Sequence, residues 1–249
     1  MIGEPGAVSQ FRPSPNHDER AGGARPDILL LHYTGMDTGE AALARLTDPD
    51  AKVSAHYVVL EDGTVVQLVA EDRRAWHAGA GSWEGRDDVN SRSIGIEIVN
   101  GGHPGGLPPY PADQIAAVAV LSAAICAEWR IRPEHVLAHS DIAPDRKEDP
   151  GEHFPWEALA GCALWVEPEP PTDAILLGPG RSGEDVAALQ AALALHGYGL
   201  AETGLYDEAT ATVLRAFQRH FRPARVDGLL DASTLSSLRR ILAAQDGAA

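Results

Sequence analysis

The sequence predicts an α/β fold in which a central mixed β-sheet is flanked by helices, followed by a small all-α domain of three helices. In the first two thirds of the chain, apolar runs of strand length alternate with segments of helical spacing. A Pro-rich segment, EPEPPT at 167–172, interrupts this pattern, and helical spacing dominates after it. The length of 249 residues also exceeds that of one typical domain.

These observations place the domain boundaries. The first domain is expected at residues 1–166 and the second at 173–249, joined by a linker at 167–172. The linker holds prolines and charges with nothing apolar to bury, a composition typical of a stiff, exposed spacer. Two domains joined in this way are expected to be separable.

The first strands are expected in the N-terminal half of the first domain. Residues 28–34 (ILLLHYT) form an apolar run of buried-strand length, and a helical pattern follows at 38–47. Two β-rich runs around the Asp62-Gly63 turn predict a hairpin over 53–69. Alternation of apolar side chains predicts a further strand at 93–99 (SIGIEIV).

A long helix is expected from Pro111 to Arg130, because apolar side chains recur there at helical spacing. Those side chains are Ile115, Val118, Leu121, Ile125 and Trp129. A last short strand is expected at 135–139 (HVLAH). Strands and helices alternate along this domain, but the hairpin makes the sheet mixed rather than all-parallel.

The second domain contains a short internal duplication. GLYDEATATVL (204–214) and GLLDASTLSSL (228–238) share the pattern G-L-x-D-x-x-T-x-x-x-L. In each copy the aspartate is expected to cap a helix. Ser182 and Asp185 are expected to open a third helix, whose inward face carries Val186, Leu189 and Leu193. No acid/base pair stands at a catalytic spacing here, so this domain is expected to bind rather than to catalyse.

Composition bounds the partners and the compartment. A formal charge of −16 argues against a nucleic-acid partner, since phosphate binding needs a basic face. Residues 1–20 show neither a secretory signal nor a lipoprotein cysteine, and no segment is interpreted as a membrane span. The cytoplasm is therefore the expected compartment, with the cell envelope as the alternative. The sequence indicates no oligomeric state. Cys126 lies in an apolar helical pattern and is expected to be a small buried side chain, which argues against a disulfide-stapled scaffold that also uses Cys162.

Two of the ten histidines stand apart because each ends an apolar strand. His32 closes the first strand and His139 the last, and neighbouring strand ends in one sheet can converge on a single point. Asp149 can supply a third ligand; two imidazoles, one carboxylate and an open fourth position form a catalytic zinc set. A lone histidine at a strand end is more often structural, so the hypothesis depends on convergence. No role is assigned to six others, interpreted as lying in loops or on polar helix faces: His17, His103, His135, His153, His196 and His220.

Five ordered motifs resemble those of zinc-dependent N-acetylmuramoyl-L-alanine amidases of the AmpD/AmiD type. They are HYTGM (32–36), VSAHYVV (53–59), AWHAG (75–79), NSRSIGIEI (90–98) and AHSDIAPDRKEDPG (138–151). The resemblance covers the chain from about Ser14 to about Ala160, and the last motif is the most specific. It implies hydrolysis of the amide bond between N-acetylmuramic acid and L-alanine, in intact peptidoglycan or in 1,6-anhydro-muropeptides.

Carried over by position, the resemblance implies that His32, His139 and Asp149 bind one Zn²⁺ per chain. It also implies that Glu97 is the catalytic acid/base and that Lys147 stabilises the developing oxyanion. Taken alone, these two would be a surface glutamate and a solvated loop lysine, and the neighbouring motifs favour the catalytic roles.

The same motifs carry candidates for the wall of the cleft that holds sugar and peptide, namely Tyr33, Trp76, His77, Arg86 and Asn90. Trp76 as a core side chain is an equal alternative. His56, within the hairpin, is expected to be structural or to support a ligand. Related phage-type amidases carry a tyrosine near Ala55, and its absence here places the acid/base role on Glu97.

The second domain resembles the type 1 peptidoglycan-binding domain over about residues 180–242. The resemblance implies that it holds the enzyme on peptidoglycan and raises the local substrate concentration. Deleting 173–249 is then expected to leave activity on small muropeptides and to weaken binding to sacculi. A non-catalytic peptidoglycan-recognition module, a peptidase and a phage-type lysin are the alternatives, and the presence of all five metal and catalytic candidates favours the amidase.

Overall fold

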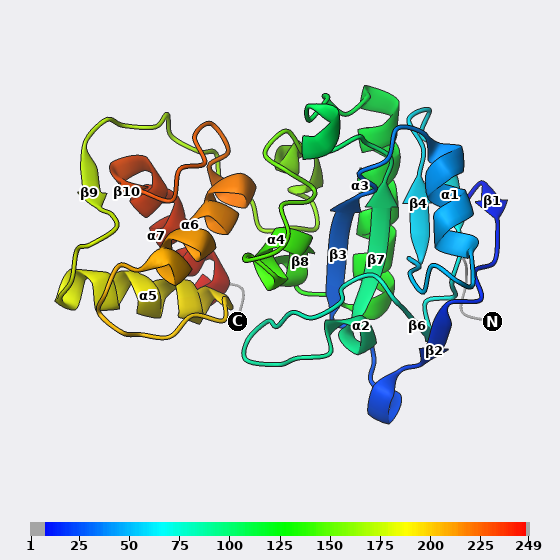
Figure 1. The fold of residues 1–249 in the computed structure, drawn as a ribbon, viewed down its shortest axis with the longest axis horizontal. Helices are drawn as coiled ribbons and strands as arrows, with labels where there is room; N and C mark the ends of the chain where they lie inside the picture. Colours follow the sequence, from blue (N-terminus) through cyan, green and yellow to red (C-terminus); the bar gives the residue numbers. More distant parts are fainter. Residues whose placement is uncertain (1–7, 248–249) are drawn as a thin grey trace.

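A six-stranded mixed sheet forms the centre of the first domain in the computed structural model, which describes residues 8–247 (Figure 1). The strand order is β1-β5-β4-β7-β3-β8. Strands β4, β7, β3 and β8 run parallel, and β5 is antiparallel to β4, so the predicted mixed sheet is confirmed. The strands span β1 Gln10–Phe11, β3 Ile28–Tyr33, β4 Tyr57–Val59, β5 Val65–Gln67, β7 Ser93–Ile98 and β8 Val136–Ala138. Residues 1–7, which enter the expectations about a signal segment and the domain start, lie outside the described residues.

Helices cover both faces of this sheet. Leu29 and Leu31 of β3 face α3 (Ala112–Trp129), whereas Val58 of β4 faces α1 (Gly39–Thr47). Both helices lie where the sequence predicts them. The Thr38 side chain caps α1 by accepting a hydrogen bond from the Ala41 N–H at 3.2 Å. The sequence did not predict the separate two-stranded sheet of β2 (His17–Glu19) and β6 (Arg73–Ala75), nor the short helices α2 (Val89–Arg92) and α4 (His139–Ile142).

Helix α3 is long and apolar enough to cross a membrane by length and composition alone, which the sequence prediction did not recognise. Within residues 8–247 it is the one helix of this kind. Its face with Ile115, Val118, Leu121 and Ile125 packs in the core against the sheet. That packing is typical of the central helix of a globular domain. Cys126 is buried on the same helix, and Cys126 and Cys162 are both free thiols.

Three helices form the second domain, as predicted: α5 (Glu184–His196), α6 (Glu208–Phe221) and α7 (Ala232–Gly247). Asp207 caps α6 by accepting the Thr210 N–H at 2.9 Å, and Asp231 accepts the Thr234 N–H at the start of α7 at 2.8 Å. The predicted opening of α5 is wrong: Gly183 is the N-cap and no side chain caps the helix. A small antiparallel pair, β9 (Ile175–Leu177) with β10 (Leu230–Asp231), completes the domain.

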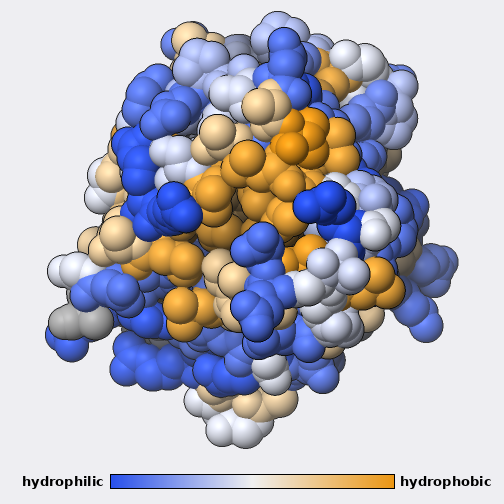
Figure 2. Space-filling view, turned by 90° about the vertical axis from the view of Figure 1, so that its left-hand side faces the viewer, coloured by the Kyte–Doolittle hydropathy of each residue, from blue (hydrophilic) through white to orange (hydrophobic). Residues whose placement is uncertain are grey.

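An apolar groove of roughly 470 Å³ opens on the outer end of the second domain, between β9, α5 and α7. Figure 2 shows this face, with apolar side chains gathered at its centre and polar ones around them. The groove is lined mainly by leucines, among them Leu176, Leu189, Leu235, Leu238 and Leu242.

The two domains share one continuous apolar cluster. It joins Leu30, Trp83 and Ile142 of the first domain to Tyr198 and Phe217 of the second. The segment 167–172 has no regular secondary structure, but it lies against the second domain rather than free in solvent. For example, the Glu169 carbonyl accepts a hydrogen bond from the Ser233 hydroxyl at 2.6 Å.

Candidate active site

The parallel strands bring the chemical groups of the site to one edge of the sheet. In the register of β3 with β7, His32 pairs with Glu97, so the two side chains lie side by side on the same face. In the register of β3 with β8, Leu31 pairs with Ala138, and His139 follows directly. The carboxyl edge of parallel strands is where open α/β sheets bind their ligands. The predicted convergence of His32 and His139 is thus produced by strand register.

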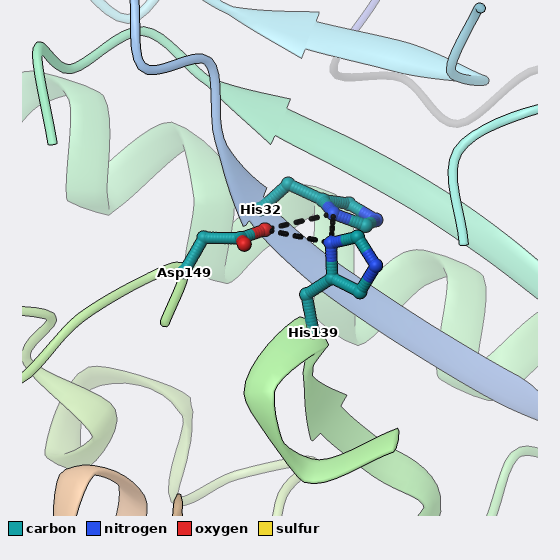
Figure 3. A group of neighbouring side chains, drawn as sticks. All are labelled: His32, His139 and Asp149. Carbon is teal, nitrogen blue, oxygen red and sulfur yellow. Dashed lines mark hydrogen bonds and ion pairs between the residues drawn. The ribbon is translucent and has the colours of Figure 1, made fainter. Parts of the chain in front are cut away.

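His32, His139 and Asp149 point at one another from β3, from the start of α4 and from the loop after α4 (Figure 3). The two Nδ1 atoms lie 2.9 Å apart, and each lies 3.0 Å from the same Asp149 oxygen, Oδ2. Each imidazole nitrogen either donates or accepts a hydrogen bond, so these three contacts cannot all be hydrogen bonds at the same time. A cation bonded to all three at about 2.0–2.2 Å would give ligand separations of this order. The donor set therefore fits a metal ion, and two nitrogens with one carboxylate suit Zn²⁺.

The outer ring nitrogens have partners that leave both Nδ1 atoms free to bind a metal. His139 Nε2 donates to the Ala78 carbonyl at 2.9 Å. His32 Nε2 lies 3.0 Å from His77 Nδ1, and His77 Nε2 lies 3.3 Å from the Ser93 hydroxyl. Such outer contacts set the tautomer and orientation of ligand imidazoles. Burial and the nearby His139 lower the pKa of His32 to about 4, so its ring is neutral at pH 7.

Glu97 lies beside this cluster with one oxygen unused. Its Oε2 is inaccessible to solvent and has no hydrogen-bond partner among the described residues. Burial and the Asp149 carboxylate raise the pKa of Glu97 to about 8, although the Lys147 ammonium lowers it. A carboxyl group with a pKa near the working pH can both take and return a proton.

We expect the metal-free Glu97→Gln variant to be more stable than the metal-free parent at pH 8. The pKa of Glu97 is higher in the folded protein than in the unfolded chain, so its contribution to stability is lost as pH rises from about 4.5 to about 8. Glutamine does not ionise and removes this loss. Denaturant unfolding with a chelator present, at pH 4.5 and pH 8, measures the difference. A gain of equal size at both pH values would contradict the raised pKa.

The loop after α4 is tied down on both sides, which places Lys147 and Asp149 at the cluster. Ser140 N–H donates to the Asp149 carbonyl at 3.1 Å, and Lys147 N–H donates to the Ala143 carbonyl at 3.0 Å. The Arg146 guanidinium donates to the carbonyl of Ala78 at 2.6 Å. Because Ala78 follows His77, this bond joins the loop to the AWHAG motif.

A cleft of roughly 260 Å³ opens over these groups. Tyr33, Trp76 and His77 line it together with Glu97 and Lys147, as the sequence analysis expected. Trp76 is partly exposed and its indole N–H donates to Asp18 at 2.7 Å, so it belongs to the cleft rim rather than to the core.

The other two expected wall residues do not line this cleft. Asn90 is buried, and its Oδ1 accepts the backbone N–H groups of His77 and Ala78 at 3.0 and 2.8 Å. It therefore holds the AWHAG loop instead of contacting a ligand. Arg86 lies on the loop before α2 and pairs with Asp27 at 3.4 Å, away from the metal cluster. Sequence proximity to the motifs misplaced both, because neither the loop before α2 nor the buried α2 itself lines the cleft.

Arg45, which was not among the residues expected at the site, lines the cleft from α1. Among residues 8–247 no ion pair or side-chain hydrogen bond involves its guanidinium, and no motif marks its position. His56, by contrast, is structural as expected: it is buried, and its Nδ1 accepts the Gly95 N–H at 2.9 Å. The six histidines given no role include three that are buried, His135, His196 and His220. Their interpretation as loop or polar-face residues is wrong.

Comparison with known proteins decides the family. Residues 22–152 match the model of the N-acetylmuramoyl-L-alanine amidase family, and residues 182–238 match that of a putative peptidoglycan binding domain. The chain belongs to the N-acetylmuramoyl-L-alanine amidase family. It is an amidase whose second domain matches the putative peptidoglycan binding domain, as its motifs indicated.

The amidase is similar to proteins of both the AmiD and AmpD types. It is 35% identical to N-acetylmuramoyl-L-alanine amidase AmiD of Escherichia coli over an alignment of 256 residues, covering 96% of this chain and 91% of that protein. It is 34% identical to 1,6-anhydro-N-acetylmuramyl-L-alanine amidase AmpD of Salmonella typhimurium over 175 residues, which cover 63% of this chain and 91% of that protein.

Solved structures extend the likeness to both domains. The E. coli AmiD complex with anhydro-N-acetylmuramic acid-L-Ala-D-gamma-Glu-L-Lys superposes with a TM-score of 0.74 at 35% identity, covering 93% of this chain and 94% of that one. AMPDH3 from Pseudomonas aeruginosa, in complex with anhydromuramic pentapeptide, gives 0.73 at 35% identity, covering 92% and 93%. The arrangement of the two domains is therefore one that relatives also adopt.

Proposed function

We propose that this amidase hydrolyses the amide bond between N-acetylmuramic acid, including its 1,6-anhydro form, and the L-alanine of muropeptides. The observation that carries the proposal is the convergence of His32, His139 and Asp149 beside Glu97 at one cleft. The relatives AmiD and AMPDH3, which share this fold, were solved with anhydromuramic peptides. Cytoplasmic recycling of such fragments is the cellular role we propose, and fractionation of producing cells tests the compartment.

We further propose that His32, His139 and Asp149 hold one Zn²⁺, which would act as a Lewis acid and make water nucleophilic near neutral pH. Glu97 takes the proton of the attacking water while the new C–O bond forms at the amide carbon. It then delivers the proton to the leaving nitrogen of L-alanine as the C–N bond breaks. The Lys147 ammonium, on the same cleft, stabilises the oxygen that becomes negative after attack.

Two further features suit a muropeptide. Arg45 offers a guanidinium at the rim of the cleft, and guanidinium groups bind carboxylates such as those of a stem peptide. The apolar groove between β9, α5 and α7 offers the second domain a surface for binding peptidoglycan, away from the catalytic cleft.

Mass analysis of the products tests this proposal. The purified protein, loaded with Zn²⁺, is incubated with an anhydro-muropeptide and, separately, with intact peptidoglycan. We expect a free stem peptide with N-terminal L-alanine from the soluble substrate. Cleavage within the stem peptide, with the muramoyl–alanine bond left intact, would identify a peptidase and contradict the proposal.

A further inference from the structure

The short helix that begins with the metal-ligand candidate His139 lies where the two domains meet. Helix α4 packs against α6 of the second domain (Figure 1). Ile142 of α4 belongs to the same apolar cluster as Leu214 and Phe217 of α6. A helix of four residues has little stability of its own, so its position depends on what surrounds it.

Asp141 is the polar centre of this contact. It is 1% exposed and lies two residues after His139. Its Oδ2 accepts the Ala138 N–H at 2.8 Å and His220 Nδ1 at 2.7 Å, and its Oδ1 accepts the Tyr198 hydroxyl at 2.7 Å. His220 and Tyr198 belong to the second domain. Two of the three hydrogen bonds to this buried carboxylate therefore come from the second domain, and a buried carboxylate without donors is costly.

The second domain also holds the other end of the metal-ligand loop. Glu148, directly before Asp149, pairs with Arg219 at 2.7 Å. Arg219 and His220 are neighbours on α6. Adjacent residues of one helix thus contact both Asp141, two residues after the ligand position His139, and Glu148, directly before the ligand position Asp149.

Aromatic packing fixes the residues that make these contacts. The His220 ring stacks on Trp156 of the first domain with 3.6 Å between the ring centroids. Trp83 meets the Tyr198 ring edge-on at 5.2 Å. A Cβ at Gly197 would lie 2.4 Å from the Trp83 ring, so this close approach needs a glycine before Tyr198. Ring contacts this close show that the second domain is packed against the first rather than loosely tethered to it.

We propose that the second domain positions the metal ligands, so that Tyr198, His220 and Arg219 are positioning residues of the catalytic centre. The inference rests on the proposed metal site. It gives the second domain a role in catalysis on small soluble muropeptides, which need no tether to peptidoglycan. Removing one of these contacts loosens α4 or its loop and weakens the site for the metal.

The test compares two buried tyrosines of the full-length protein. Tyr198→Phe removes the hydroxyl that binds Asp141. Tyr206→Phe is the matched control, because the Tyr206 hydroxyl donates to the Gly228 carbonyl at 2.8 Å within the second domain. We expect Tyr198→Phe to weaken Zn²⁺ binding by about 3- to 10-fold, measured by competition with a chromogenic chelator. Amide exchange in residues 139–149 should quicken, and kcat on a soluble muropeptide should fall with KM unchanged.

A second pair keeps the test decisive if Tyr198→Phe folds poorly. Arg219→Gln removes the contact with Glu148. Arg215→Gln on the same helix removes a pair with Glu208 and a hydrogen bond to Thr212, both inside the second domain. Arg219→Gln should weaken Zn²⁺ binding and Arg215→Gln should not. Parental Zn²⁺ affinity in both Tyr198→Phe and Arg219→Gln, or equal losses in the controls, would overturn the inference. A parent protein that binds no Zn²⁺ would instead overturn the proposed metal site.

Discussion

Glu97→Gln is expected to keep its metal and to lose turnover by about 100-fold or more. The substitution preserves the shape of the side chain on β7 and removes its ability to take and return a proton. The metal ligands belong to β3 and to the segment 139–149, and no hydrogen bond among the described residues joins Glu97 to them, so we expect their positions to persist in the variant. Metal content per chain and kcat on a soluble muropeptide are the two measurements.

A matched control separates proton transfer from the loss of a buried acid. Glu134 is also poorly exposed and also has one oxygen without a partner among the described residues, but it lies outside the cleft. We expect Glu134→Gln to retain turnover close to that of the parent. Near-parental turnover of Glu97→Gln would remove Glu97 from the mechanism.

Removing the metal is expected to abolish hydrolysis of the muramoyl–alanine bond, and adding Zn²⁺ is expected to restore it. Without the ion, no group replaces its Lewis acidity at the cleft, and the two Nδ1 atoms and Asp149 keep only proton-mediated contacts. Activity before and after chelation, with circular dichroism to confirm that the fold persists, provides the measurement.

Mg²⁺ is the control ion for this experiment. It prefers octahedral oxygen ligands, whereas two of the three donors here are imidazole nitrogens, so Mg²⁺ should not restore activity. Activity that survives complete chelation would contradict the zinc proposal.

Most elements of the fold could be predicted because their signals are local. The apolar run at 28–34 becomes β3, the pattern after Pro111 becomes α3, and the duplicated aspartates cap α6 and α7. The elements that escaped prediction are very short, such as β2, β6 and α4. They also consist mainly of polar residues, whereas β4, β5 and β8 are equally short but lie in apolar, β-rich runs that predict a strand.

The residues of the site were likewise predictable only where a specific motif marks them. Five residues belonging to specific motifs, His32, His139, Asp149, Glu97 and Lys147, come together at one cleft as expected. Arg86 and Asn90 do not line it, and Arg45 lines it without any motif. Which face a loop or helix residue presents to a cleft depends on how the elements pack, and spacing along the chain does not encode that.

By itself, the sequence determined the family of this protein and the order of its main elements, because motifs and strand patterns are formed by residues close together along the chain. Tertiary structure alone decided how the two domains relate. The Pro-rich segment 167–172 predicted separable modules, but the domains share an apolar core, and Asp141 takes hydrogen bonds from Tyr198 and His220 more than 50 residues away. We now expect deletion of 173–249 to expose that core and leave Asp141 short of donors. The physical reason is that a buried carboxylate needs hydrogen-bond donors and an apolar surface needs apolar neighbours, and the folded structure decides which residues supply them.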